Sequence, residues 1–250
     1  MQFGQTQFGS LPQVTKNLLI INGLFFLGKI LEIGIDFDKL FALHQFQSAS
    51  FMPHQLITHM FLHADFTHLL FNMFALFMFG RVLESVWGPK RFLSYYILTG
   101  VGAALIYIGY MQYQIYEFSS TLDPNKLTMS MKVIKTQVAS DLIHNGQNYV
   151  DPILGKLNAL INVPMLGASG AVYGLLLAFG MLFPNTELYL MFIPIPIKAK
   201  YLVMGLAALA LFGGINNHPG DNIAHFAHLG GMIFGFILLK IWQKNRNTFY

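Results

Sequence analysis

The stretch GASGAVYG, residues 167–174, places Ser169 between two glycines at the start of an apolar run that continues to Phe183. About 20 apolar residues are enough to cross a bilayer, so we read Leu166–Phe183 as a membrane span. Small residues often line helix contacts in membranes because they let two backbones approach closely. The serine therefore has a structural explanation as well as a chemical one, and other parts of the chain must decide between them.

The composition is that of a membrane protein. The 250 residues are 54% hydrophobic and 10% charged, whereas soluble domains carry about 25% charged residues. The chain has no cysteine, which excludes disulfides and thiolate metal sites. No basic or aromatic nucleic-acid-binding motif accompanies the net charge of +4, so we expect no nucleic-acid partner. We also expect no cofactor and no metal.

Hydropathy predicts an all-α fold, a bundle of six transmembrane helices. The predicted spans are Leu18–Ile35, Phe66–Leu83, Phe92–Tyr110, Leu166–Phe183, Tyr201–Ile215 and Ala224–Trp242. In domain terms, residues 17–243 form the membrane domain, and residues 1–16 and 244–250 are short cytoplasmic tails. The bilayer is thus an expected partner.

Basic residues in the short loops predict the orientation. The loop between the second and third spans contains Arg81, Lys90 and Arg91, whereas the loop between the fifth and sixth spans has no Lys or Arg. Both termini are therefore expected in the cytoplasm. We expect a multi-pass protein of the cell (inner) membrane, with the start of spans two, four and six on the extracytoplasmic side.

Two long stretches do not span. Residues 36–65 are polar and rich in histidine but carry scattered aromatic residues, so we expect an interfacial segment. Residues 112–164 are too long for an idle loop and form an extracytoplasmic insertion. An amphipathic helix within this insertion is predicted by apolar residues at helical spacing: Leu127, Met131, Ile134, Val138 and Leu142.

Polar residues occur at the start of three predicted spans. His68 and Asn72 share one face of span two, Ser169 opens span four, and His228 lies in the first turns of span six. If these spans run in the same direction, all four side chains lie at one depth. Glycines at close-packing spacing would let spans four and six touch: Gly170, Gly174, Gly231 and Gly235.

These residue types support acyl transfer. A serine hydroxyl needs a base to take its proton, and a neutral histidine can act as that base. The side chains of His68 and Asn72, with the backbone N–H of Ser169, could stabilise an oxyanion. We find no acid placed as a third partner, so we expect a dyad of Ser169 and His228. Tyr173 could stack on the histidine ring or be a core aromatic residue.

The chain resembles the rhomboid intramembrane serine proteases. The matching residues are Gly167-x-Ser169-Gly170 with Tyr173, His68-x-x-x-Asn72, and Ala227-His228-x-x-Gly231-x-x-x-Gly235. The resemblance implies cleavage of single-span membrane proteins within or beside their transmembrane segment. It also implies that Ser169 is the nucleophile, His228 the base, and His68 and Asn72 part of the oxyanion hole. Where many relatives have a Trp-Arg pair, this chain reads Pro53-His54-Gln55.

Other assignments remain open at this level. His225 competes with His228 as the base, and we favour His228 because only it has the Gly231 and Gly235 spacing. A metal-handling protein or transporter could instead use His59, His63, His68, His225 and His228. A third possibility is a protein that binds membrane clients without cutting them. We expect His54, His59 and His63 to be structural, and Glu84 to pair with Arg81.

Overall fold

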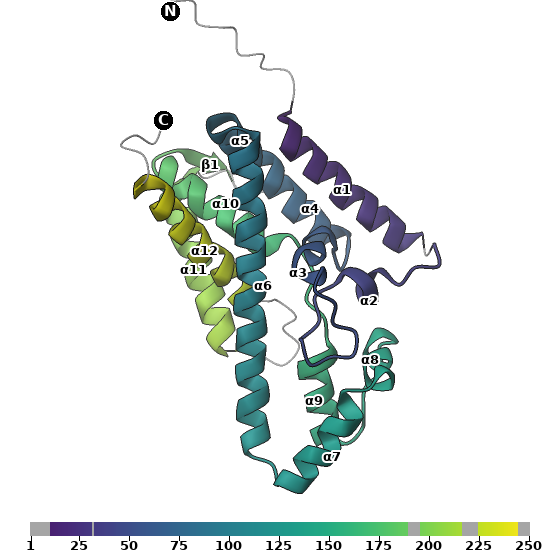
Figure 1. Ribbon diagram of the computed structural model, residues 1–250. Helices are drawn as coiled ribbons and strands as arrows, with labels where there is room; N and C mark the ends of the chain where they lie inside the picture. Colours follow the sequence, from purple (N-terminus) through teal and green to yellow (C-terminus); the bar gives the residue numbers. More distant parts are fainter. Residues whose placement is uncertain (1–10, 32, 190–195, 217–224, 245–250) are drawn as a thin grey trace, which may run out of the picture.

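The computed structural model describes residues 11–31, 33–189, 196–216 and 225–244. The protein is mostly helical, and its long helices pack into a bundle (Figure 1). The bundle contains α1 (Gln13–Ile30), a segment made of α4 (Phe66–Ala75), η2 (Leu76–Gly80) and α5 (Arg81–Trp87), and then α6 (Pro89–Ser120), α10 (Ser169–Leu182), α11 (Ala199–Asn216) and α12 (His225–Lys244).

Within the described ranges, four helices are long and apolar enough to cross a membrane: Phe66–Trp87, Pro89–Ser120, Ala199–Asn216 and His225–Lys244. The chain is therefore an integral membrane protein. Helix α10 is apolar but has 14 residues, or about 21 Å, against a hydrocarbon core of about 30 Å. Helix α1 does not reach the same criterion of length and composition. The count of six spans thus remains a prediction.

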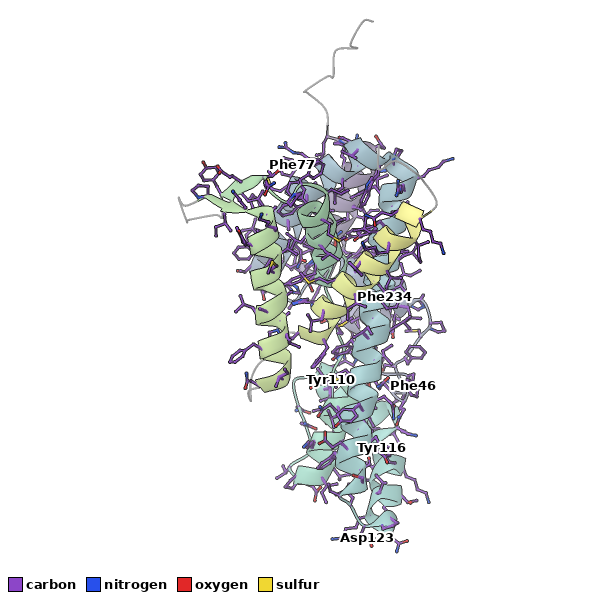
Figure 2. All side chains as sticks on the ribbon, turned by 90° about the vertical axis from the view of Figure 1, so that its left-hand side faces the viewer. Phe46, Phe77, Tyr110, Tyr116, Asp123 and Phe234 are labelled. Atoms are coloured by element: carbon purple, nitrogen blue, oxygen red, sulfur yellow. The ribbon has the colours of Figure 1, made fainter. Side chains whose placement is uncertain are left out.

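Helix α6 is longer than its predicted span. It continues from Tyr110 to Ser120 without a break, so the first part of the predicted insertion belongs to a membrane helix. With 32 residues, α6 is about 48 Å long. Figure 2 shows its far end, near Tyr116 and Asp123, well beyond the contact with Phe234 of α12. The insertion is thereby carried away from the main bundle.

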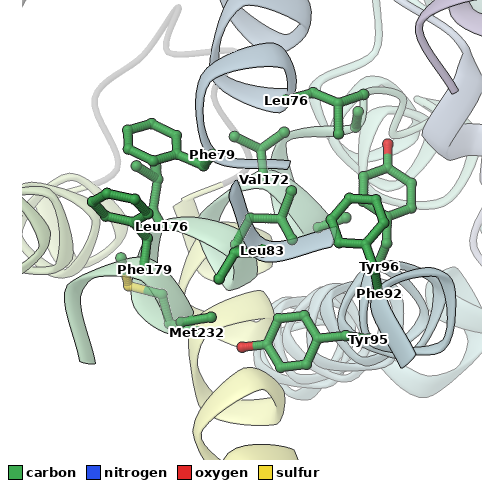
Figure 3. Close-up of a cluster of buried hydrophobic side chains, with 14 of the residues drawn as sticks. Leu76, Phe79, Leu83, Phe92, Tyr95, Tyr96, Val172, Leu176, Phe179 and Met232 are labelled. Carbon is green, nitrogen blue, oxygen red and sulfur yellow. The ribbon is translucent and has the colours of Figure 1, made fainter. Parts of the chain in front are cut away.

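Helices α6, α10 and α12 form the centre of the bundle. Gly231 of α12 lies against the backbone of Gly170, and a side chain at Gly102 of α6 would collide with Phe234 of α12. Such contacts need glycine because a Cβ atom would occupy the neighbour's volume. A buried apolar cluster joins this centre to the η2–α5 segment, with Leu76, Phe79, Val172, Leu176 and Met232 among its members (Figure 3).

Residues 36–65, which we call loop 1, contain α2 (Phe37–Phe41), α3 (Gln55–Thr58) and η1 (His59–Phe61). Gln55 is fully buried and holds the loop together. Its Oε1 accepts from the backbone N–H groups of His44 and Met52 at 3.3 and 3.1 Å, and its Nε2 donates to Ser50 O at 2.9 Å. Gln55 therefore anchors the loop.

The insertion forms three helices, α7 (Pro124–Ile134), α8 (Gln137–His144) and α9 (Pro152–Asn162). The apolar residues predicted to share one amphipathic helix are divided between two helices, α7 and α8. The helix stops after Ile134, and Thr136 caps the next one by accepting from Ala139 N. This break turns Val138 outward, where it is 67% exposed, and buries Ala139 instead.

Glu84 does not pair with Arg81. Its carboxylate accepts from Val14 N, Thr15 N and Thr15 Oγ1 at 2.7–2.8 Å, so it caps the start of α1 from the second span. Pro12 at the N-cap offers no side-chain acceptor there, and the first N–H groups of a helix need one. A distant carboxylate meets that need and also suits the positive end of the helix dipole.

The all-α expectation needs a small correction. An antiparallel hairpin of β1 (Glu187–Tyr189) and β2 (Pro196–Lys198) joins α10 to α11. Its residues alternate, with Leu188 and Ile197 less exposed than their neighbours, which is a strand pattern. The start of α1 and the end of α12 lie at the same end of the bundle in Figure 1. The side of the membrane to which that end belongs remains a prediction.

Candidate active site

Ser169 and His228 meet where two glycine-rich helices begin. The imidazole Nε2 of His228 lies 2.9 Å from the hydroxyl oxygen of Ser169. Ser169 is the first residue of α10, and His228 lies in the first turn of α12. The contact of Gly231 with Gly170 brings the two helix starts together. If Nε2 accepts the hydroxyl hydrogen, the imidazole proton is on Nδ1.

Gly167 shapes the approach to Ser169. Its φ of 126° lies in the region that favours glycine. A Cβ atom built there would lie 2.8 Å from Cε1 of His68 and 3.8 Å from the Ser169 hydroxyl oxygen. Glycine thus keeps a space open between the His68 ring and the hydroxyl. The backbone N–H of Ser169 belongs to the first turn of α10, so it has no partner within its own helix.

His68 and Asn72 lie on the first turns of α4, as predicted. Asp65 caps this helix by accepting from His68 N at 2.8 Å. The Asn72 amide donates one hydrogen to His68 O at 2.9 Å, which leaves its second hydrogen for another acceptor. Ala64 N approaches Nδ1 of His68 at 3.5 Å. That approach favours the tautomer with the proton on Nε2, the nitrogen that faces Gly167.

Tyr173 and His225 both lie close to His228. The ring of Tyr173 is stacked on the His228 imidazole, with centroids 4.2 Å apart and planes 10° from parallel. The His225 ring fills the space beside Gly213 of α11 and meets His228 edge-on, with centroids 6.3 Å apart. Of the two histidines that compete as the base, His228 is thus the one in contact with Ser169.

The remaining glycines serve helix packing. Gly174 lies against Thr99 of α6. A Cβ atom added to Gly235 would lie 3.4 Å from the Cα of Gly174. Tyr95 donates its hydroxyl to Gly174 O at 3.0 Å. The predicted contact between spans four and six is therefore present, and α6 closes it from the other side.

Loop 1 contributes contacts that the sequence patterns did not indicate. Gly167 N donates to His59 O at 2.9 Å, and Leu43 pairs with Met165 in an isolated antiparallel bridge. Asp65 could have been predicted, since it stands three residues before His68 in a capping position. The bridge partners are too far apart in the sequence for a local signal.

The histidines of loop 1 differ in their hydrogen bonds. A ring nitrogen of His54 lies 2.8 Å from Leu40 O, and one of His59 lies 2.9 Å from Gln55 O. His63 is fully buried, and neither of its ring nitrogens has a hydrogen-bond partner among the described residues. Its ring packs edge-on against His68, with centroids 5.0 Å apart. Burial lowers the pKa of His59 to about 4 and that of His63 to about 3.

In the described ranges, no three side chains of His, Cys, Asp or Glu converge in an arrangement that could hold a metal ion. A serine hydroxyl in contact with an imidazole is an arrangement that serine-hydrolase chemistry needs, and here it lies inside a helical membrane protein.

Comparison with known proteins agrees with this class. A family model described as eukaryotic integral membrane proteins (DUF1751) matches residues 19–249. The chain is 30% identical over 196 residues to "Putative rhomboid protease YdcA" of Bacillus subtilis, covering 77% of this chain and 69% of that one. It is 27% identical over 240 residues to RHOMBOID-like protein 12, mitochondrial, of Arabidopsis thaliana, covering 94% and 60%. It is 29% identical over 185 residues to Rhomboid protease AarA of Providencia stuartii, covering 72% and 52%.

The chain belongs to the rhomboid family of integral membrane proteins. It spans between about half and 69% of the length of these three relatives. One of them is named as mitochondrial and two come from bacteria. The relatives named as mitochondrial give no support for the cell (inner) membrane as the compartment.

Proposed function

We propose that this chain is an intramembrane serine endopeptidase. Its substrates are single-span membrane proteins, cut within or next to the transmembrane segment. The observation that carries the proposal is the 2.9 Å contact between the hydroxyl of Ser169 and Nε2 of His228. Membership of the rhomboid family, some of whose members are named proteases, supports it.

The chemistry uses two protein side chains for proton and acyl transfer. Ser169 Oγ attacks the scissile carbonyl carbon while its proton passes to Nε2 of His228. The carbonyl oxygen becomes an oxyanion, and the C–N bond breaks as His228 returns the proton to the leaving amine. A water molecule then attacks the acyl-serine ester with His228 again as base, which releases the second product and restores the serine.

The oxyanion donors come from two helix starts. The backbone N–H of Ser169 has no partner within α10, Nε2 of His68 faces Gly167, and the Asn72 amide has a second hydrogen left to donate. Such donors act strongly because they are already oriented before charge develops. Tyr173 holds the His228 ring by stacking on it. The site is expected on the extracytoplasmic side of the membrane.

The test is cleavage of a tagged single-span substrate by the purified protein in liposomes. The wild type is expected to cleave it, and Ser169→Ala and His228→Ala are each expected to abolish the cleavage. His225→Ala is the matched control, because it removes a neighbouring imidazole that does not contact Ser169, and it is expected to retain activity. Full activity in Ser169→Ala would overturn the proposal. A wild type that binds the substrate without cutting it would support the client-binding alternative.

A further inference from the structure

Helix α8 of the insertion is joined to loop 1 by polar contacts. Asp141 Oδ1 lies 2.8 Å from Lys39 Nζ, and the hydroxyls of Ser140 and Ser50 are 2.8 Å apart. Nε2 of His144 lies 3.1 Å from Nε2 of His44. The insertion's own apolar cluster, which includes Ile134, Ala139, Leu157 and Ile161, contains no residue of loop 1 among its described members. Hydrogen bonds and one ion pair therefore dominate this interface.

The contact between the two histidines has a defined direction. Nδ1 of His44 lies 3.1 Å from Ala42 O and 3.4 Å from Gln55 Oε1, and both of these atoms are acceptors. Nδ1 must therefore carry the hydrogen of a neutral ring, and Nε2 must accept. His144 is the donor. Because His44 is fully buried, loss of this donor would leave a buried acceptor without a partner.

Loop 1 in turn contacts both sides of the candidate site. Leu43, next to His44, exchanges two backbone hydrogen bonds of 2.8 Å with Met165, four residues before Ser169. His59 O accepts from Gly167 N, and the His63 ring packs against His68. A shift of loop 1 would therefore move the segment before Ser169 through Leu43 and His59. It would also move the His68 ring through His63.

We propose that α8 is a positioning latch: Ser140, Asp141 and His144 hold loop 1 in the place that sets the His68 ring against the Gly167–Ser169 segment. This role rests on the proposed protease function. None of the three residues touches the reacting atoms, so each acts through loop 1. The proposal gives the insertion a role, although neither the proposed dyad nor the proposed oxyanion donors lie in it.

The polar character of the latch determines the expected size of its effects. Water can replace a lost hydrogen bond at a surface, and the side chains of the Lys39–Asp141 pair are 34% and 43% exposed. A variant should therefore loosen loop 1 without unfolding the bundle. Loss of one net hydrogen bond corresponds to roughly a threefold to tenfold effect. The effect should fall on kcat, because the latch contacts no part of the substrate.

The experiment compares His144→Ala, His144→Gln and Lys132→Ala in the full chain. Glutamine retains an N–H donor for His44, and Lys132 is an exposed residue of α7 with no described contact to loop 1. The measurements are kcat and KM for a single-span substrate, and amide hydrogen exchange of residues 42–63. We expect His144→Ala to lower kcat about threefold to tenfold, to leave KM within about twofold, and to speed exchange in loop 1. His144→Gln should restore both values, and Lys132→Ala should change neither.

The two readouts separate this inference from the proposed function. An active wild type whose kcat and loop-1 exchange do not respond to His144→Ala would overturn the latch and leave the protease intact. Failure of His144→Gln to rescue would also overturn it, because the donor role would be wrong. A wild type without proteolysis refutes both the protease function and the catalytic role of the latch, even if His144→Ala still speeds exchange.

Discussion

At the scale of single residues, the site depends on which nitrogen of each imidazole carries its hydrogen. His228 must accept at Nε2 to take the Ser169 proton, while His68 must donate at Nε2 to stabilise an oxyanion. The surroundings favour this difference for His68, since Ala64 N approaches its Nδ1. The proposed mechanism thus gives the two histidines opposite tasks, and the Ala64 N–H supports the donor form of His68.

Asn72 is the residue whose role can be measured most simply. Replacement by alanine removes the amide hydrogen that is left after the bond to His68 O. We expect Asn72→Ala to lower kcat by about 10-fold to 1000-fold, since loss of a fully engaged oxyanion donor costs about 100-fold to 1000-fold. Single-turnover cleavage would show it. A kcat equal to that of the wild type would remove Asn72 from the oxyanion hole.

At the scale of elements, helix starts rather than whole helices build the site. Helices α4, α10 and α12 begin near one another, and glycine contacts fix the distance between α10 and α12. Spans and motif positions could be predicted because hydropathy and spacing are local. The end of α6, the break before Thr136 and the hairpin of β1 and β2 depend on capping and tertiary contacts. Gln55 shows the same limit, since its many partners appear only once loop 1 is folded.

Gly231 tests the contact between α10 and α12. A Cβ atom there would overlap the carbonyl group of Gly170, so Gly231→Ala must push the helices apart. We expect a loss of about 1–3 kcal/mol in the free energy of unfolding and a fall in kcat of at least tenfold, because His228 moves from Ser169. Gly109→Ala in α6 is the control, as nothing lies within 4 Å of its added Cβ. Equal stability and activity of the two variants would contradict this packing.

Glu84 tests the cap of α1. Glu84→Gln keeps the shape of the side chain but removes the charge and one acceptor oxygen that serves Thr15. We expect the free energy of unfolding in detergent to fall by about 1–3 kcal/mol. The neighbouring Ser85→Ala, which removes an exposed hydroxyl that donates to Arg81 O of its own helix, should change it by less than about 0.5 kcal/mol. An unchanged stability in Glu84→Gln would show that the carboxylate does not support α1.

At the scale of the whole molecule, loop 1 contains buried neutral histidines that lie outside the spans. Burial, with the nearby His144 adding to it, lowers the pKa of His44 to about 4, and burial lowers the pKa of His59 to about 4 as well. The folded loop therefore binds fewer protons than the unfolded chain, in which histidine has a pKa near 6.5. Its stability is present above about pH 6.5 and falls as the pH drops towards 4.

Acid sensitivity of loop 1 is the consequence. Within that pH window, each such histidine should lower the free energy of unfolding by up to about 1.4 kcal/mol per pH unit. The protection of amides 36–65, measured as the exchange rate relative to the intrinsic rate at each pH, should fall between pH 6.5 and pH 4.5, and that of the bundle helices should respond less. His59→Gln should flatten this pH dependence by about one proton. An equally steep pH dependence in His59→Gln would show that His59 is not buried as a neutral group.

The most direct test of the central claim is reaction of the purified protein with a fluorophosphonate, followed by mapping of the labelled peptide. The geometry predicts labelling at Ser169 in the wild type and in His225→Ala, and no labelling in His228→Ala. Absence of labelling in the wild type, or equal labelling after Ser169→Ala, would contradict a serine activated by His228.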